Sequence, residues 1–278
     1  MIRFLRNKRK ILLTLAGLLS CAFVVYPFLW ALFTSLKINT EIMAYPPTLY
    51  PKHISLTSYS EILLKGGMPR YFLNSLIVAC GSVLVTLVIA AHAGYSSARF
   101  SFPGKSAIMM GILISGMIPG VALLVPLYMM ATKLHLMNTF FALIMVYGGW
   151  RLFNAVWLME SFFDQVPKEI EEAAMIDGCS RIQAFYRTIL PLTQPGLAAT
   201  TIMTFIYVWN DFIRAYALIT NSDMWVVQIG LFQFMTTYGI EWGQLMAAVM
   251  IGSIPAIILF IALQNRFIEG LTAGATKG

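Results

Sequence analysis

Six long apolar runs constrain this chain more than any other feature of its sequence. A helix that crosses a bilayer needs about 20 apolar residues, because the hydrocarbon core is about 30 Å thick. Only 11% of the 278 residues are charged, whereas a soluble domain carries about 25%, so lipid is the expected solvent. We therefore predict an all-α membrane protein with six transmembrane helices, at residues 11–36, 72–98, 107–131, 139–163, 196–220 and 244–263.

The first apolar run has two readings, because five basic residues between Arg3 and Lys10 precede it. A cleaved signal peptide has the same basic start, but its apolar core is only about 7–15 residues long. No cleavage site of the small-x-small type is obvious after the run. We therefore interpret it as a retained membrane anchor.

The distribution of Lys and Arg predicts the orientation, because cytoplasmic segments carry the excess of positive charge. With the N-terminus inside, the inner segments hold 12 of the 19 basic residues and the outer loops hold five. Both termini are thus expected in the cytoplasm. The predicted organisation is a basic N-terminus at 1–10, a transmembrane domain at 11–265 with an extracytoplasmic loop at 37–71 and a cytoplasmic loop at 164–195, and a cytoplasmic tail at 266–278.

Several other functions find no support in the residues. The net charge is +7, but the basic residues form no single patch, so no nucleic-acid partner is expected. Gly104-Lys105-Ser106 resembles the end of a phosphate-binding loop, yet Arg99 stands where that motif needs a glycine. The three cysteines are far apart and fit no metal or disulfide spacing. Neither a catalytic nor a metal site is predicted.

An acidic segment interrupts this apolar chain, since five of its 12 acidic residues lie between Asp164 and Asp177. Pro167 suits the first turn of a helix, and Gly178 is expected to end it by adopting a left-handed backbone. Ser180 and Gln183 form a candidate capping box for a second, amphipathic helix that ends at Pro191 and Pro195. One interpretation is an ordinary connector with a solvated acidic face; the other is a docking element.

The docking interpretation gains support from a resemblance. Glu172-Ala173-Ala174, Gly178 and Leu190-Pro191 resemble the EAA motif of ABC importer permeases, although Thr188 stands where that family usually has isoleucine. Six further stretches are similar, in order, to the carbohydrate-uptake permeases of the maltose type. They are TSYSEIL (57–63), FLNSLIVA (72–79), ARFSFPGKS (98–106), YVWNDF (207–212), EWGQLMAA (241–248) and the tail at 266–278.

This resemblance implies a non-catalytic permease subunit with the type I ABC importer fold, in the inner membrane of a bacterium. The implied partners are a second permease, often non-identical, two ATP-binding cassette subunits that hold ATP and Mg, and an extracytoplasmic solute-binding protein that delivers a saccharide. The residues implied in coupling to the ATPase are Glu171, Glu172, Ala173, Ala174, Asp177, Gly178, Leu190 and Pro191.

Charged residues inside the predicted spans indicate the pathway, because a charge in the membrane is costly and functional by default. Arg151 and Asp211 are expected at similar depths, with Arg214 close by. One interpretation is an internal ion pair. The other is recognition of an anionic saccharide, since guanidinium groups suit carboxylates and phosphates and both arginines depart from the family's usual residues. The candidate pathway residues are Asn210, Trp209, Asp211, Arg151, Arg214, Asn74, Tyr207 and Trp150.

Two alternatives from other classes stay open at this point. One is an ion-coupled secondary transporter of a small polar solute, although the chain shows no matching pair of halves. The other is a membrane-embedded enzyme, although the spans offer few acidic residues and no cluster of histidines. The identity and length of the saccharide are not encoded in any motif.

Overall fold

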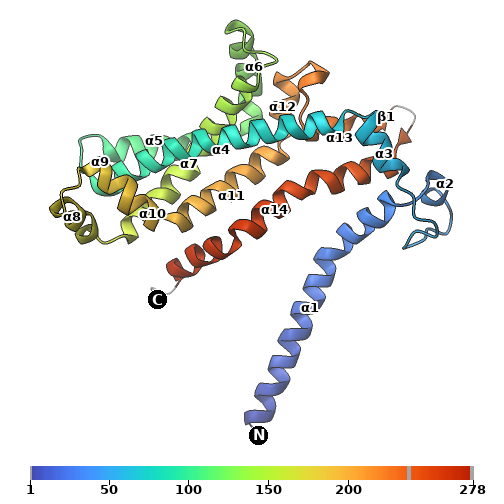
Figure 1. Cartoon of the computed structure of the whole chain (residues 1–278), viewed down its shortest axis with the longest axis horizontal. Coiled ribbons are helices and arrows are strands. Elements are labelled where there is room, and N and C mark those ends of the chain that lie inside the picture. The colour runs from blue at the N-terminus through green and yellow to red at the C-terminus, as the bar shows by residue number, and fades with distance from the viewer. Residues whose placement is uncertain (1, 237–238, 276–278) are drawn as a thin grey trace. The chain divides into compact units, whose positions relative to one another are not determined.

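The structure is a computed structural model that describes residues 2–236 and 239–275 and forms two compact units (Figure 1). Residue 1 of the expected N-terminal segment and residues 276–278 of the expected tail lie outside the described residues. Unit 1 contains residues 1–69 and 230–253, and unit 2 contains residues 70–229 and 254–278.

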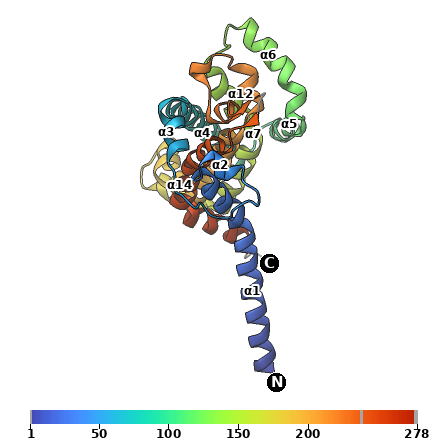
Figure 2. The same ribbon diagram turned by 90° about the vertical axis from the view of Figure 1, so that its right-hand side faces the viewer.

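Unit 1 is built on helix α1 (Ile2–Ser35) and the first part of α14 (Trp242–Ala275). Figure 2 shows α1 as one long continuous helix. Its apolar side chains from Leu12 to Trp30 are exposed, as expected of a helix that faces lipid. The smaller elements of this unit are α2 (Asn39–Ile42), α3 (Thr57–Leu64), and the antiparallel strands β1 (Met235–Thr236) and β2 (Gly239–Ile240), in which Met235 pairs with Ile240.

The loop after α2 is held by two charged side chains of unit 1. Glu41 Oε1 accepts hydrogen bonds from the Lys52 backbone N–H at 2.8 Å and from Thr48 Oγ1 at 3.0 Å. Lys37 Nζ donates to the Thr48 carbonyl oxygen. The hydrogen bond from Lys52 is the main cause that lowers the pKa of Glu41 below its ordinary value. The loop is therefore tied down by an ionised carboxylate.

Unit 2 is a bundle in which α4, α5, α7 and α11 form the main body (Figure 1). The Thr86 hydroxyl of α4 donates to the Gly148 carbonyl of α7 at 3.2 Å, which shows how closely these two helices approach. The elements in chain order are α4 (Met68–Arg99), α5 (Lys105–Met117), η1 (Gly120–Leu123), α6 (Leu124–Lys133), α7 (Phe140–Gln165), α8 (Lys168–Ile176), α9 (Arg181–Ala184), the π-helical η2 (Phe185–Ile189), α10 (Leu190–Leu192), α11 (Gln194–Asn210), α12 (Ile213–Leu218), η3 (Ser222–Met224) and α13 (Val227–Phe232).

The described residues contain four helices that are long and apolar enough to cross a membrane, or up to six if two bent pairs are each one span. This agrees with the predicted all-α membrane fold. The four spans are Leu12–Ser35, Met68–Arg99, Phe140–Gln165 and Trp242–Phe267. They correspond to the first, second, fourth and sixth predicted segments, with ends that shift by a few residues.

The third and fifth predicted segments are helical but broken by bends. The third is bent by 93° between Met117 and Gly120, because Pro119 provides no backbone N–H and holds Ile118 in an extended conformation. In the fifth, α11 ends at Asn210, and Asp211 begins a break before α12. The preceding residues, Arg181–Leu192, meet α11 at an angle of 73°.

Candidate functional site

The predicted docking element forms a helix, a tight turn and a second helix. α8 begins after Pro167, and Gly178 has a φ of +89°, a backbone conformation that favours glycine. The Cys179 N–H donates to the Ala174 carbonyl at 3.0 Å, and the Gly178 N–H donates to the Met175 carbonyl at 3.1 Å. These two bonds make a Schellman motif, which satisfies the last carbonyl groups of α8.

The second helix of the loop starts with the predicted capping box. The Gln183 N–H donates to Ser180 Oγ at 3.3 Å, and the Ser180 N–H donates to Gln183 Oε1 at 2.9 Å. The helix then continues through η2 into α10, where Pro191 is exposed and Leu190 packs at the edge of the core. The end of the first helix and the start of the second are thus defined by hydrogen bonds within the loop.

Glu171 is a charged residue of this loop whose side chain is buried in the protein interior. Its Oε1 accepts a hydrogen bond from the Tyr95 hydroxyl at 2.5 Å, and its Oε2 pairs with Arg99 Nε at 3.0 Å. The side chains of Glu171 and Arg99 are only 7% and 5% exposed. Arg99 also donates to the Val166 carbonyl at 2.8 Å. The carboxylate therefore attaches α8 to the end of α4, whereas the sequence grouped Glu171 with the residues that contact the ATPase.

Aromatic packing supports this attachment. The rings of Tyr95 and Phe185 lie 4.6 Å apart between centroids, and Phe163 lies 5.7 Å from Tyr95. All three rings belong to a buried core cluster that also contains Ile189. The loop therefore packs directly against α4 and α7.

Several of the other predicted coupling residues are exposed on α8 or directly after it. Glu172, Ala173, Asp177 and Gly178 are exposed, and Ala174 is half-buried. Ile176, the last residue of α8, is 86% exposed. The short side chain of Ala173 and the apolar side chain of Ile176 permit the close approach of another protein surface, and Glu172 and Asp177 add negative charge beside them.

The charged pathway residues of α7, α11 and α12 meet in one cluster. Asp211 Oδ1 accepts hydrogen bonds from the Tyr147 hydroxyl at 3.0 Å and from the Arg214 backbone N–H at 2.9 Å. The guanidinium group of Arg214 forms an ion pair with Asp211 Oδ2. Asp211 therefore caps α12 at the helix break and neutralises Arg214.

Aromatic rings hold both arginines of the cluster. The guanidinium carbon of Arg214 lies 4.6 Å from the Trp150 ring centroid and 5.5 Å from that of Tyr207. The guanidinium carbon of Arg151 lies 4.7 Å from the Tyr207 ring centroid. Two interpretations of these charges were an internal ion pair and recognition of an anionic saccharide. Arg214 does form the internal ion pair. Arg151 has no ion pair with any described residue.

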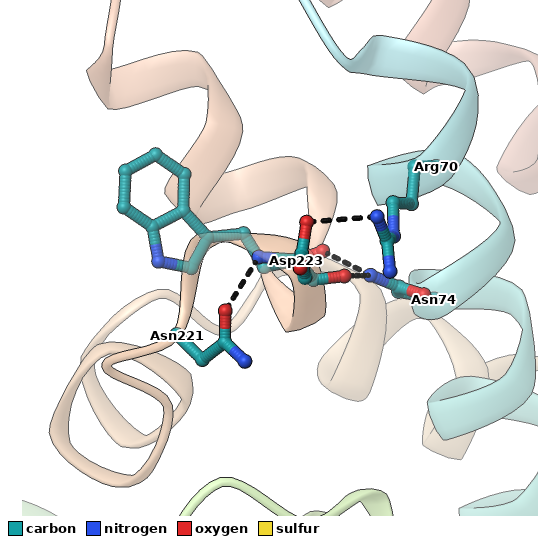
Figure 3. A network of polar contacts seen from close by, with 5 residues as sticks. Arg70, Asn74, Asn221 and Asp223 are labelled. Atoms are coloured by element: carbon teal, nitrogen blue, oxygen red, sulfur yellow. Dashed lines mark hydrogen bonds and ion pairs between the residues drawn. The ribbon is translucent and has the colours of Figure 1, made fainter.

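The remaining pathway candidates lie outside this cluster. Trp209 is buried against Phe72 and Phe205, and Asn210 turns its amide back to the Ile206 carbonyl at 2.9 Å. Asn74 is buried and donates to the backbone carbonyls of Asp223 and Trp225 (Figure 3). A role of these three residues in substrate binding remains a prediction.

The contacts of Asn74 belong to a loop scaffold at the start of α4. Arg70 Nη1 pairs with Asp223 Oδ1 at 2.7 Å, and the Asp223 N–H donates to Asn221 Oδ1 at 3.0 Å (Figure 3). Both side chains of the ion pair are about 60% exposed. The buried hydrogen bonds of this scaffold are therefore those that Asn74 donates. The scaffold holds the segment from Asn221 to Trp225 in one conformation.

Gly120 is a residue of the cluster that the sequence analysis did not identify. A methyl group on Gly120 would lie 2.2 Å from Arg214 Nη2 and 3.1 Å from a ring carbon of Trp150. The bend at Pro119 therefore brings a glycine backbone against the guanidinium group. A Pro-Gly pair inside an apolar segment was the available signal, because this pair marks a turn.

Gly120→Ala is expected to displace Arg214 from Trp150 and to weaken its ion pair with Asp211. Arg214 is held by both contacts, so overpacking by one methyl group destabilises the chain by about 1–3 kcal/mol. We expect a lower thermal unfolding midpoint of the purified chain in detergent. The matched control is Gly111→Ala in α5, where an added methyl group meets nothing within 4 Å. Equal midpoints for the two variants would contradict the close packing at Gly120.

Known transport proteins are similar to this chain in sequence. Residues 87–272 match the family described as binding-protein-dependent transport system inner membrane component. The chain is 33% identical to the sulfoquinovosyl glycerol transport system permease protein SmoH of Agrobacterium fabrum, over 91% of this chain and 89% of that protein. It is 34% identical to the trehalose/maltose transport system permease protein MalG of Thermococcus litoralis, over 97% of this chain and 98% of that protein.

A solved structure shows the same fold. A chain of a bacterial ABC transporter involved in the import of the acidic polysaccharide alginate superposes with a TM-score of 0.82. The sequence identity is 20%, and the match covers 94% of this chain and 98% of that chain.

Proposed function

Because this chain belongs to the family of binding-protein-dependent transport system inner membrane components, we propose that it forms half of the translocation pathway of an ATP-driven saccharide importer. The chain is a multi-pass permease of the cytoplasmic membrane and is not the catalytic subunit, since its family is described as an inner membrane component and its relatives are named permease proteins. The family membership also removes the two alternatives, an ion-coupled secondary transporter and a membrane-embedded enzyme.

The observation that carries the proposal is the two-sided geometry of α8. Its inner side is fixed to α4 by the buried pair of Glu171 and Arg99, and its outer side exposes Ala173 and Ile176. A helix with one fixed face and one open face acts as a lever when a partner moves against the open face. We assign that partner to a pair of ATP-binding subunits, which supply the ATP and Mg.

Two further partners complete the proposed assembly. A second permease, identical or not, closes the pathway opposite this chain. An extracytoplasmic binding protein delivers the substrate, and this is supported by a solved alginate transporter in complex with a periplasmic protein, at a TM-score of 0.63. In this scheme ATP binding shifts the population between inward-open and outward-open states.

We propose an acidic oligosaccharide as the favoured substrate. Arg151, Arg214 and Asp211 leave the cluster with a net charge of +1, and the rings of Trp150 and Tyr207 lie beside it. Aromatic rings stack on the apolar faces of sugars, and the excess positive charge complements an acidic group. The named relatives carry different sugars, so the family alone does not select between neutral and acidic substrates.

The proposal is tested by co-purification of the tagged chain with its partners and by an ATPase assay in proteoliposomes. We expect ATP-binding subunits to co-purify, and ATP hydrolysis to rise more with a binding protein loaded with an acidic oligosaccharide than with a neutral one. Ile176→Glu is expected to reduce co-purification about tenfold, since it buries an unpaired charge at the docking face. Ile54→Glu is the control, because Ile54 is also exposed (75%) but lies in the predicted extracytoplasmic loop.

Each outcome decides a different part of the proposal. If no ATP-binding subunit co-purifies with the chain, the coupling role of α8 is refuted. If the neutral oligosaccharide stimulates ATP hydrolysis as strongly as the acidic one, the importer remains and the acidic substrate is refuted. Equal effects of the two glutamate variants would remove Ile176 from the docking face.

A further inference from the structure

The two arginines of the cluster differ in how their charge is compensated. Arg214 pairs with Asp211, and its own backbone N–H adds a second bond to that carboxylate. Arg151 forms no ion pair with any described residue, and its buried Nε has no hydrogen-bond partner among them. The excess charge of the cluster therefore belongs to Arg151.

The position of Arg151 makes this charge costly. It lies in the first half of α7, which is long and apolar enough to span the membrane. A charged side chain in such a segment is expensive to retain and marks a functional position. The Tyr207 ring, 4.7 Å from the guanidinium carbon, compensates part of the cost through a cation–π contact. A ring contact satisfies none of the five N–H donors of the group.

The neighbouring residues show what the guanidinium group is prepared to bind. A planar guanidinium that stacks on an aromatic ring still presents its edge, and two N–H groups on that edge match the two oxygens of a carboxylate. Asp211 is the carboxylate of the cluster, but it is already used by Tyr147 and Arg214. The internal acceptor is thus occupied and the donors of Arg151 remain available for a ligand.

We propose that Arg151 on its Tyr207 platform is the residue that selects acidic sugars, by binding one carboxylate or sulfonate group of the passing saccharide. Arg214 is a positioning residue in this arrangement: together with Trp150 it packs against Gly120, and it also contacts the Tyr207 ring. This inference rests on the proposed transport of a saccharide and adds to it a division of labour between two arginines.

The test is direct binding of trigalacturonate and maltotriose to the full-length chain in lipid nanodiscs, measured by calorimetry. We expect the wild-type chain to prefer trigalacturonate. In Arg151→Gln the affinity for trigalacturonate falls about 10- to 100-fold, the range of a lost hydrogen bond to a charged group, while the affinity for maltotriose is unchanged. Arg151→Lys keeps the charge without the planar guanidinium group. Its affinity for trigalacturonate is expected to lie between those of the wild type and Arg151→Gln.

The control is Arg70→Gln, which removes an exposed arginine of the same unit that pairs with Asp223 outside the cluster (Figure 3). It is expected to bind both trisaccharides as the wild type does. The proposal is overturned if the wild-type chain shows no preference for trigalacturonate, or if Arg151→Gln retains that preference. Thermal unfolding of each variant separates a lost ligand contact from a misfolded chain.

The result is separable from the fate of the importer proposal. If ATP-binding subunits fail to co-purify but trigalacturonate binding depends on Arg151, the acidic-sugar site stands and the coupling proposal falls. If ATP-driven uptake of a neutral sugar is observed and Arg151→Gln changes no binding preference, the importer stands and the role of Arg151 falls.

Discussion

Glu171→Leu is expected to uncouple the permease from its ATP source. The substitution leaves the buried guanidinium group of Arg99 without its carboxylate, and breaking such a pair costs about 3–5 kcal/mol. It also removes the acceptor of the Tyr95 hydroxyl. We expect α8 to detach from the end of α4, with loss of ATP-dependent uptake and a lower thermal unfolding midpoint.

The double variant Glu171→Leu with Arg99→Met separates this mechanism from a simple loss of a docking residue. Replacing both partners of a buried pair by apolar residues is often close to neutral, so the double variant is expected to regain most of its thermal stability. Glu169→Gln is the control, because Glu169 is exposed on the same helix. If the double variant is no more stable than Glu171→Leu alone, the ion pair is not what attaches α8.

Gly178→Pro is expected to abolish transport while leaving membrane insertion intact. Proline requires a φ near −65°, whereas Gly178 has a φ of +89° and donates its N–H to Met175. The Schellman motif is lost, and α8 no longer meets α9 at a defined angle. Strain of about 1–3 kcal/mol at this turn is expected to reduce ATP-dependent uptake in proteoliposomes at least tenfold.

Gly178→Asn is the matched control for this turn, because asparagine tolerates the left-handed conformation better than other residues. It is expected to retain most of the uptake. No heavy atom lies within 4 Å of a methyl group placed on Gly178, so the effect of proline arises from the backbone and not from a clash. Normal uptake by Gly178→Pro would refute the lever mechanism.

Much of the fold was predictable from the sequence, and the exceptions have local causes. Runs of apolar residues located α1, α4, α7 and α14, because hydropathy is a sum over neighbours in the chain. The two segments that break contain their own signals, namely Pro119-Gly120 and the polar Asp211. Hydropathy averaged over about 20 residues changes little at such a single position, so it does not reveal the break.

The candidate site also contains some features that the sequence predicts and others that it does not. Gly178 and the Ser180–Gln183 capping box were identified in advance, because the bonds that they make span no more than five residues. The inward direction of Glu171 was not predicted, since it depends on Tyr95 and Arg99, more than 70 residues earlier in the chain. The spacing of Tyr95 and Arg99 by four residues on one helix face was the available signal.

The sequence by itself determined that this chain crosses a membrane repeatedly and that Gly178 separates one short helix from a second, capped helix, because hydropathy and helix capping act between near neighbours. Only the tertiary structure decided which arginine is neutralised. Arg151 and Arg214 looked equivalent in the sequence, and both lie on the Tyr207 ring. The helix break at Asp211 gives the carboxylate to Arg214, three residues away, and leaves Arg151 with the uncompensated charge.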